Sequence, residues 1–284
     1  MSGIWPEPSI IHEAVSRALG EDLGPLDITS HALISADRMT QARIFVKEPA
    51  VLAGNIVAEA VFRKINPSLR CEYRKKDGEF LEKGETVLEI KGSARDILSG
   101  ERSALNFLQH LSGIATETAR YVKAAKGTHT RILDTRKTTP GLRILEKYAV
   151  LCGGGVNHRM GLYDAFMIKD NHIALMKNHG SLAEAVQQAR AFNPEAHLTV
   201  EADTLEQVRI LAELNVDRIL LDNMDNTALG EAVKLISKRC ETEASGNMTL
   251  ERIPSVATTG VDFISIGALT HSVRAVDFSL EIID

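Results

Sequence analysis

The second half of the chain alternates short apolar runs with amphipathic helical segments, and this alternation restricts the fold more than any other feature. After Gly127 the runs fall at residues 131–134, 165–169, 198–201, 218–222, 241–245 and 262–267. Strands that alternate with helices form a parallel sheet with right-handed crossovers. Six strand–helix units favour an α/β barrel with fewer than eight strands, and a doubly wound sheet is the alternative.

The residues before Gly127 follow a mixed pattern. Apolar positions from Ile10 to Leu19 form a helical stripe that we expect to end at Gly20. The other expected elements are strands over residues 43–47, 69–74 and 86–90 and helices over residues 55–65 and 93–126. We expect Gly113 to break the last of these helices. The boundary between an N-terminal α+β unit and the strand–helix units is therefore predicted near Gly113.

The composition excludes several classes of protein. With 44% hydrophobic and 25% charged residues among 284, the chain has the composition of an ordinary globular protein. Cys71, Cys152 and Cys240 form no closely spaced pair, which argues against a disulfide framework or a structural zinc site and fits a cytoplasmic location. We find no secretory signal and no apolar stretch near the ~18 residues of a membrane span. The net charge of −5 disfavours nucleic acid as a partner, so an anion site must be a local cluster of cations.

The carboxyl ends of parallel strands meet at one edge of a sheet, where α/β folds hold their active sites. The segments that follow the six predicted strands are Thr135-Arg136-Lys137, Lys169, Glu201, Asp222, Ser245-Gly246-Asn247 and Gly267-Ala268. Loops between strands and helices are polar in any such fold, so each segment alone could be ordinary surface. Together they predict a charged site at this edge.

The first of these loops predicts an anion site. Arg136 and Lys137 lie just before a helix that we expect to begin with Thr139 as N-cap and Pro140 as the first helical residue. Free backbone N–H groups and the positive end of a helix dipole would then lie beside both cations. An isolated Arg-Lys pair could also be solvated surface charge.

Two later segments can add to this positive charge. The glycines at 153–155 predict a flexible or close-packed loop that lets His158 and Arg159 approach a ligand, although His158 could equally be an ordinary hydrogen-bonded histidine. Lys169 ends a mostly apolar strand. It is either a surface residue with a buried stem or a functional cation at the mouth of the barrel.

Glu201 and Asp222 each end a strand, so both carboxylates would face the same opening. Such a pair can hold ribose hydroxyls, bind hydrated Mg²⁺ or stabilise positive charge that develops on a sugar carbon. Simple ion pairs and glycoside hydrolysis are the alternatives, and the surrounding cations favour an anionic substrate. The small residues of the last two loops would let the backbone close around a phosphate.

In their order along the chain, these segments resemble the motifs of the quinolinate phosphoribosyltransferase family, also called nicotinate-nucleotide pyrophosphorylases. The motifs that carry the resemblance are Glu21-Asp22-Leu23-Gly24, Glu101-Arg102-Ser103-Ala104-Leu105-Asn106, Thr135-Arg136-Lys137-Thr138-Thr139-Pro140-Gly141, Asn157-His158-Arg159, Met167-Ile168-Lys169-Asp170-Asn171-His172, Glu201, Leu221-Asp222-Asn223, Glu243-Ala244-Ser245-Gly246 and Ser265-Ile266-Gly267-Ala268. The resemblance covers nearly the whole chain. It implies an N-terminal α/β sandwich domain at 1–112 and an incomplete α/β barrel at 113–284, whose last residues can pack back on the first domain.

The resemblance also implies an activity and a set of roles. The implied reaction converts quinolinate and phosphoribosyl pyrophosphate to nicotinate mononucleotide, pyrophosphate and CO₂ in NAD biosynthesis, in a homodimer or dimer-based oligomer with shared active sites. Implied catalytic residues are Lys137, Lys169, Glu201 and Asp222, and Glu201 and Asp222 would hold Mg²⁺, partly through substrate and water. Implied substrate-binding residues are these four together with Arg102 from the partner subunit, Thr135, Arg136, His158, Arg159, Ser245, Gly246, Asn247, Ile266, Gly267 and Ala268.

One position departs from the family pattern. Asn247 stands where the family usually has a second glycine, and asparagine tolerates a left-handed backbone, so we expect the phosphate loop to keep its form. The alternatives within the fold are the related protein associated with molybdenum transport and nicotinate phosphoribosyltransferase. Outside it, Lys169 could form a Schiff base in an aldolase, or the cations could bind a phosphorylated metabolite without catalysis.

Overall fold

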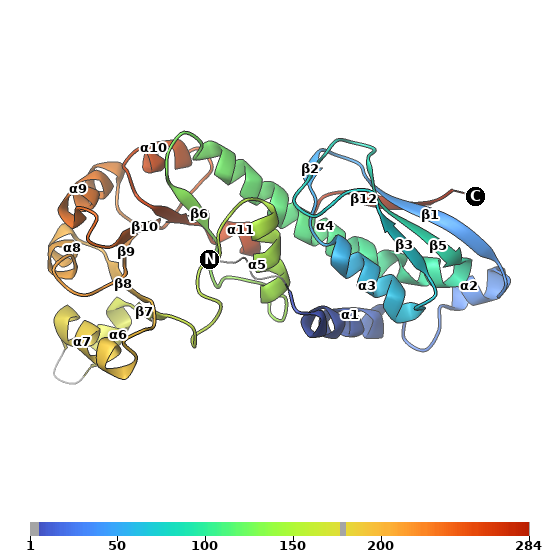
Figure 1. Cartoon of the computed structure of the whole chain (residues 1–284), viewed down its shortest axis with the longest axis horizontal. Coiled ribbons are helices and arrows are strands. Elements are labelled where there is room, and N and C mark those ends of the chain that lie inside the picture. Colours follow the sequence, from blue (N-terminus) through green and yellow to red (C-terminus); the bar gives the residue numbers. More distant parts are fainter. Residues whose placement is uncertain (1–5, 177–179, 284) are drawn as a thin grey trace. The chain divides into compact units, whose positions relative to one another are not determined.

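The computed structural model describes residues 6–176 and 180–283, and these residues form two compact units (Figure 1). The first unit contains the chain up to Ala119, together with Thr138–Gly154 and the residues from Ala268 onward. The second unit contains Arg120–Lys137 and Gly155–Gly267. The chain therefore passes from one unit to the other at four points.

The first unit is an antiparallel sheet with helices packed against it. Its strands lie in the order β12 (Phe278–Ile282), β1 (Met39–Val46), β5 (Thr86–Ser93) and β3 (Arg70–Tyr73). Every second residue of β1 is buried, and Ile44 and Val46 join Phe62 and Leu108 from the helices in one apolar core. This arrangement confirms the predicted N-terminal α/β sandwich. The C-terminal strand β12 completes the sheet by pairing with β1.

The remaining elements of the first unit are helical or short. Its helices are α1 (Pro8–Asp22), α2 (Ile28–Leu33), α3 (Asn55–Ile65), most of α4 (Ala94–Ala124), α5 (Arg143–Cys152) and α11 (Ala268–His271). Two short strands, β2 (Ala50–Val51) and β4 (Phe80–Leu81), pair with each other. Among the helices that the structure describes, none is both long and apolar enough to span a membrane.

Three expectations about helix ends were wrong. Helix α1 continues past Gly20 to Asp22, and α4 runs unbroken through Gly113. A Cβ atom at Gly113 would collide with the carbonyl oxygen of Arg274, so this glycine permits a close approach of the C-terminal segment. Thr139 is not a helix cap either, because Gly141 adopts a φ of +82° and α5 begins only at Arg143.

The second unit is a parallel sheet that does not close. Its strands lie in the order β6 (Arg131–Leu133), β11 (Phe263–Ser265), β10 (Glu241–Ser245), β9 (Arg218–Asp222), β8 (Leu198–Ala202) and β7 (Phe166–Ile168). All six strands were predicted from the alternation. From β7 to β11, each strand pairs with the next strand in the sequence, and β6 pairs with β11. This is the strand order of a barrel that is open between β6 and β7. This order confirms the incomplete barrel and excludes a doubly wound sheet.

Helices follow the strands and cover one face of this sheet. They are α6 (Asp170–Ala174), α7 (Leu182–Phe192), α8 (Leu205–Leu211), α9 (Asn226–Ile236) and α10 (Ile253–Ala257). Side chains cap three of them: Ser181 accepts from Glu184 N–H, Thr204 from Gln207 N–H and Asp225 from Ala228 N–H. These caps fix where each strand-to-helix loop ends, and so help to position the residues at the strand ends.

Candidate active site

Strand register places the predicted polar residues on one face of the parallel sheet. Met167 pairs with Thr199, and Ser245 pairs with Asp222. Side chains alternate along a strand, so residues two positions apart lie on the same face of the sheet. Lys169 therefore shares the face of Met167, and Glu201 shares the face of Thr199. The opposite face carries buried apolar side chains such as Val200, Leu221 and Ala244. The inner face is therefore the polar one, and its carboxyl-terminal edge forms the candidate active site.

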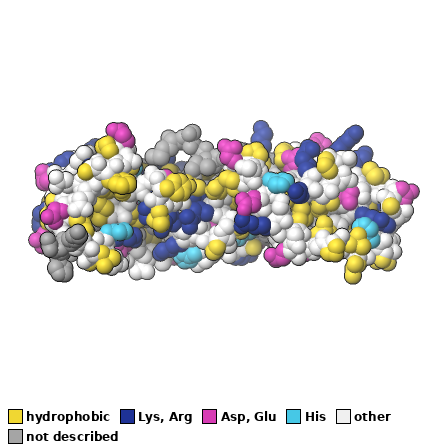
Figure 2. Space-filling view, turned by 90° about the horizontal axis from the view of Figure 1, so that it is seen from below, with side chains coloured by type: hydrophobic (Ala, Val, Ile, Leu, Met, Phe, Trp, Pro, Cys, Tyr) yellow, Lys and Arg dark blue, Asp and Glu magenta, His cyan; other side chains and the backbone are white. Residues whose placement is uncertain are grey.

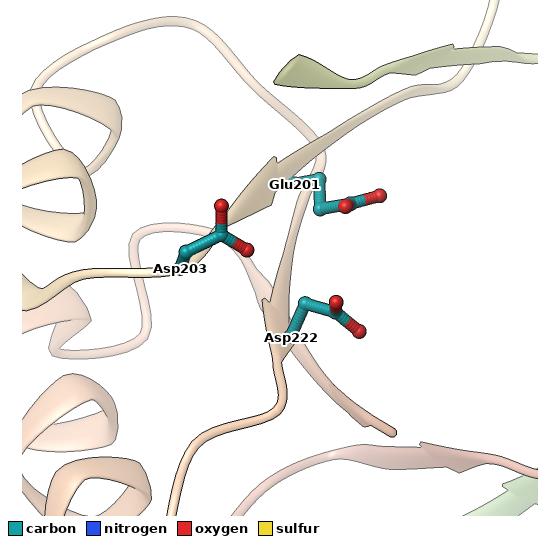
Figure 3. A group of neighbouring side chains, drawn as sticks. All are labelled: Glu201, Asp203 and Asp222. Atoms are coloured by element: carbon teal, nitrogen blue, oxygen red, sulfur yellow. The ribbon is translucent and has the colours of Figure 1, made fainter. Parts of the chain in front are cut away.

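Three carboxylates meet at this edge. One carboxylate oxygen from each of Glu201, Asp203 and Asp222 lies within 4.8 Å of the other two (Figure 3). Figure 3 shows the carboxylates of Glu201 and Asp222 directed toward the same side, with Asp203 beside them. Three oxygen donors at this spacing match the ligand preference of Mg²⁺. The donor chemistry thus fits the expected metal.

Asp203 was not among the residues expected from the sequence. It lies just beyond β8, two positions after Glu201, and strand alternation gives both residues the same direction. The segment Glu201-Ala202-Asp203 therefore carried a signal that could have identified it.

Lys169 lies beside the acidic group. Its Nζ is 3.1 Å from Oε2 of Glu201, and 45% of the lysine side chain remains exposed against 14% for Glu201. Such a half-exposed ion pair adds little to stability. The contact instead holds an ammonium group at the edge of the site with part of its hydrogen-bonding capacity open to a ligand.

Two arginines lie close enough to affect each other. The pKa of Arg159 is lowered from its ordinary value by burial and by the positive charge of Arg136, although Asp164 acts in the opposite direction. One Nη of Arg159 donates to the carbonyl oxygen of Ala165 at 3.0 Å. Two guanidinium groups in a partly buried place repel each other, and an anionic ligand between them would relieve this repulsion. The shared role of Arg136 and Arg159 in binding an anion remains a prediction.

A buried carboxylate fastens the loop that carries Arg159. Asp134 is fully buried at the end of β6, and it accepts from Nδ2 of Asn157 at 2.7 Å and from the backbone N–H of His158 at 2.8 Å. Sequence reasoning did not single out Asp134, although it directly precedes Thr135-Arg136-Lys137. The loop that carries Arg159 is therefore held by a buried contact with Asp134, a residue that lies outside the solvent-exposed part of the site.

His158 points away from solvent. Only 8% of its side chain is exposed, and its Nε2 lies 3.4 Å from Oε2 of the fully buried Glu243. Its Nδ1 accepts the backbone N–H of Arg159 at 2.7 Å. The prediction that His158 binds substrate directly remains a prediction, since the imidazole nitrogens already face protein groups in this structure.

The predicted phosphate loop is left-handed at two successive residues. Gly246 has a φ of +95° and Asn247 a φ of +48°, which confirms that asparagine takes the left-handed conformation here. A Cβ atom at Gly246 would collide with the side chain of Asn223. Arg252 donates to the carbonyl oxygens of Gly246, at 3.1 Å, and Met224, at 2.8 Å. Glycine is therefore required at position 246. The hydrogen bonds of Arg252 hold the loop in this conformation.

Comparison with known proteins decides the family. The model of the quinolinate phosphoribosyl transferase C-terminal domain matches residues 114–281, and that of the N-terminal domain matches residues 27–112. This chain belongs to the quinolinate phosphoribosyltransferase family. The resemblance found in the sequence is thereby confirmed, and so is the predicted class of enzyme.

Individual members of the quinolinate phosphoribosyltransferase family are similar over almost all of the chain. A mitochondrial decarboxylating quinolinate phosphoribosyltransferase 2 from Nicotiana glauca is 44% identical over 96% of this chain and 82% of its own length. A probable carboxylating nicotinate-nucleotide pyrophosphorylase from Bacillus subtilis is 44% identical over 92% of this chain and 90% of its own. The structure of the nicotinate-nucleotide pyrophosphorylase from Francisella tularensis superposes with a TM-score of 0.94 at 36% identity, covering 99% and 98% of the two chains.

The other residues expected from the family likeness are placed as follows. Oγ1 of Thr135 accepts the backbone N–H of Lys137 at 3.0 Å, and the side chain of Lys137 is exposed. Ile266 donates its N–H to Leu133, which ties the loop after β11 to β6. Ala268 begins α11, and Arg102 is exposed on α4; both belong to the first unit. The roles of all these residues remain predictions.

The distribution of charge suits an anion-binding member of this family. The face shown in Figure 2 carries a gathering of Lys and Arg side chains over the part of the picture that the second unit occupies. A cavity of about 830 Å³ exists elsewhere in this unit, lined by residues that precede strands, among them His197, Asp217 and Asp262. It opens at the amino-terminal edge of the sheet, the edge opposite the candidate site, where parallel α/β folds do not hold their active sites.

Proposed function

We propose that this chain catalyses the decarboxylating phosphoribosyl transfer that its relatives' names describe. The nitrogen of quinolinate bonds to C1 of phosphoribosyl pyrophosphate, pyrophosphate leaves, and the carboxylate on C2 of the ring departs as CO₂. The product is nicotinate mononucleotide. The single observation that carries this proposal is the contact of opposite charges at one sheet edge, where Lys169 lies 3.1 Å from Glu201 beside the acidic group of Glu201, Asp203 and Asp222.

The cationic group is suited to quinolinate. Quinolinate carries two carboxylates, and arginine grips a carboxylate through two parallel hydrogen bonds. The repulsion between Arg136 and Arg159 is relieved when an anion lies between them, so part of the electrostatic penalty present in the empty site is removed by binding. Lys169, with its ammonium group partly open beyond Glu201, completes the positive side.

The acidic group is suited to the ribose and to Mg²⁺. Glu201 and Asp222 would hold Mg²⁺, partly through water and substrate oxygens, and Asp203 adds a third donor. Bound there, Mg²⁺ would neutralise negative charge on the leaving pyrophosphate. The carboxylates themselves stabilise the positive charge that develops at C1 as its bond to pyrophosphate lengthens. The 5′-phosphate is assigned to the loops at Ser245-Gly246-Asn247 and Ile266-Gly267-Ala268, where backbone N–H groups are available.

The chemistry needs no covalent nucleophile from the protein. The quinolinate nitrogen supplies the electron pair for the new bond to C1, and Lys137 and Lys169 are assigned to meet negative charge on the substrates. After nitrogen is alkylated, the electron pair left by CO₂ stays at C2 beside the positive ring nitrogen and is then protonated. The main task of the protein is to hold two polyanions in a reactive orientation.

We further propose a homodimer or dimer-based oligomer in the cytoplasm, with Arg102 completing the active site of the partner subunit. Arg102 is exposed on α4, so its guanidinium is available to another molecule. The location and the oligomeric state rest on the family likeness and on the cysteine pattern of the sequence.

Incubation of the purified protein with quinolinate, phosphoribosyl pyrophosphate and Mg²⁺ tests the proposal. We expect equal amounts of nicotinate mononucleotide and CO₂, and loss of both when Mg²⁺ is replaced by a chelator. A parallel reaction with nicotinate in place of quinolinate separates this activity from that of a nicotinate phosphoribosyltransferase. Binding of both substrates without release of pyrophosphate would contradict catalysis and would leave a metabolite-binding protein.

A further inference from the structure

The interior of the second unit contains a buried charged chain that the proposed mechanism does not use. Arg218 is only 5% exposed, and its guanidinium reaches Glu241 at 2.7 Å and Glu243 at 3.0 Å. Glu243 in turn approaches His158 at 3.4 Å. The strands of an α/β barrel ordinarily fill this interior with branched apolar side chains. Charges in such a place are expensive unless they have a function or full compensation.

The charges compensate one another around Glu243. Burial alone would raise the pKa of Glu243, but the neighbouring His158, the charge of Arg218 and contact with Ser265 hold it below its usual value. The ring of Phe263 lies 4.1 Å from the guanidinium carbon of Arg218 and covers its flat face. Glu243 is thus a fixed buried carboxylate that contacts Arg218 and His158 through the same oxygen.

The hydrogen bonds of His158 fix its tautomer. Because Nδ1 accepts the backbone N–H of Arg159 at 2.7 Å, the proton of the neutral ring must be on Nε2, the atom that faces Glu243. A carboxylate behind an imidazole selects tautomer and ring orientation in the same way in serine proteases. The imidazole of His158 therefore lies between the buried carboxylate of Glu243 and the backbone of Arg159.

From this geometry we propose that Glu243 is a positioning residue: through His158 it holds Arg159 in place for the carboxylates of the substrate. Glu243 does not touch the substrate. Arg218 donates to Oε2 of Glu243, the same oxygen lies 3.4 Å from Nε2 of His158 without a hydrogen bond between them, and Nδ1 of His158 accepts the N–H of Arg159. Asp134 holds the same loop through the N–H of His158, so two buried carboxylates fix the loop that carries Arg159. This inference rests on the proposed function for the identity of the substrate.

The decisive variant is Glu243→Asp. It keeps the buried negative charge but withdraws the carboxylate by one methylene group from both Arg218 and His158, because the same Oε2 of Glu243 contacts both. Glu241→Gln is the matched control, because Glu241 bonds the other side of the same guanidinium, and its side chain is 43% exposed. Both variants disturb Arg218, and only the first disturbs His158.

Two measurements separate positioning from a merely structural role. Nitrogen NMR of protein labelled in its nine histidines, with the His158 signals assigned by loss in His158→Gln, reports which ring nitrogen carries the proton. We expect one tautomer in the unchanged protein and in Glu241→Gln. A mixture is expected in Glu243→Asp, because an imidazole no longer held by Glu243 can turn away from the Arg159 N–H that fixes the tautomer. Steady-state kinetics should show KM for quinolinate raised about 10- to 100-fold in Glu243→Asp, by analogy with the loss that follows when a group that orients a metal-binding histidine is removed. KM for phosphoribosyl pyrophosphate should stay within about twofold.

The outcomes are distinguishable. An unchanged His158 tautomer in Glu243→Asp, or equal loss of affinity for both substrates, would overturn the positioning role. If Glu243→Asp does not fold, His158→Gln provides the second test, since its amide oxygen can still accept the Arg159 N–H while the link to Glu243 is weakened; an unchanged KM for quinolinate would then overturn the proposal. If the unchanged protein makes no mononucleotide, the proposed function fails by itself, and the NMR comparison still tests whether Glu243 fixes His158.

Discussion

The two units bury their charged side chains in different places. The first unit packs Ile44, Phe62, Leu88 and Leu108 into one apolar cluster, each with no exposed surface, and buries Glu146 and Lys147 on helix α5. In the second unit the buried charges lie on the strands or at their ends, with Arg218 at 5% and Glu243 at 0% exposure on the inner face of the parallel sheet. Burial of apolar surface is the dominant stabilising term in folding, whereas buried ion pairs are close to neutral once desolvation is counted.

This difference separates stability from chemistry. The second unit still has apolar packing, but it lies on the outer face of the sheet, where residues such as Val200 and Leu221 lie with the helices. The inner face is left for groups that hold and orient charged substrates. We therefore expect substitutions in the apolar core of the first unit to reduce stability with little direct effect on chemistry. Substitutions at the carboxyl-terminal edge of the parallel sheet in the second unit should reduce activity with little effect on stability.

The largest expected effect is the loss of turnover in Arg136→Ala and Lys169→Ala. Each removes a cation that lies next to another charged group of the site, and we expect kcat/KM for quinolinate to fall by roughly 10²- to 10³-fold, the scale of losing one preorganised electrostatic contact. The midpoint of thermal unfolding should move little, because the ion pair of Lys169 is half exposed. Lys234→Ala, on the exposed face of α9, is the control. Near-normal activity in both variants would end the assignment of these roles.

The converse effect is expected for Phe62→Ala in the first unit. Phe62 is fully buried, and removal of such a ring should lower the free energy of unfolding by about 3–5 kcal/mol. At low temperature, where the variant remains folded, kcat/KM should stay within a few-fold of the unchanged protein. Chemical denaturation of Phe62→Ala beside Phe192→Ala, whose ring is 85% exposed, measures the difference. A large loss of activity in folded Phe62→Ala would show that the units are not separable in this way.

Backbone geometry at the phosphate loop should give a smaller change. Gly246→Ala places a methyl group against Asn223 at a φ of +95°, so we expect KM for phosphoribosyl pyrophosphate to rise about tenfold and stability to fall by about 1–2 kcal/mol. Gly230→Ala is the control, because a Cβ atom there meets no neighbour within 4 Å, and alanine favours the helix. A rise in KM for quinolinate alone would move this loop to the other substrate.

Local patterns predicted the strands and most of the site. The six parallel strands were found because apolar alternation is visible within a few residues, and Glu201, Asp222 and Lys169 followed from their place at strand ends. The break expected at Gly113 was wrong because the reason for that glycine is Arg274, far away in the sequence.

Buried contacts beneath the site were also invisible to local patterns. The sequence shows Glu243 inside a short strand, but its partners Arg218 and His158 come from other strands and loops. Asp203 differs, since it follows Glu201 at a spacing that strand alternation makes meaningful. Residues that act through long-range pairing therefore require coordinates, while those at strand ends do not.

Besides Ala268 at the proposed phosphate loop, the first unit is expected to contribute to chemistry through Arg102, across the proposed dimer. Mixing Arg102→Ala with Lys169→Ala and allowing subunits to exchange should restore about a quarter of full activity, because half of randomly formed dimers are mixed and each holds one intact site of two. Activity is measured before and after exchange, with each variant alone as the baseline. No recovery, despite proven exchange, would remove Arg102 from the partner's site.

The smallest effect is expected from Asn247→Gly, which gives this chain the glycine usual in the family. Asn247 already takes a φ of +48°, and asparagine tolerates this conformation at a penalty of about 1 kcal/mol or less, so the change relaxes little. KM for phosphoribosyl pyrophosphate should fall by about threefold at most. Asn223→Gly is the contrasting variant, because Asn223 has a similar φ of +53° but its amide donates to Asp222 at 2.6 Å. If activity survives in Asn223→Gly and falls in Asn247→Gly, the side chain of Asn247 contacts the substrate, and the charged edge of the second unit is larger than proposed.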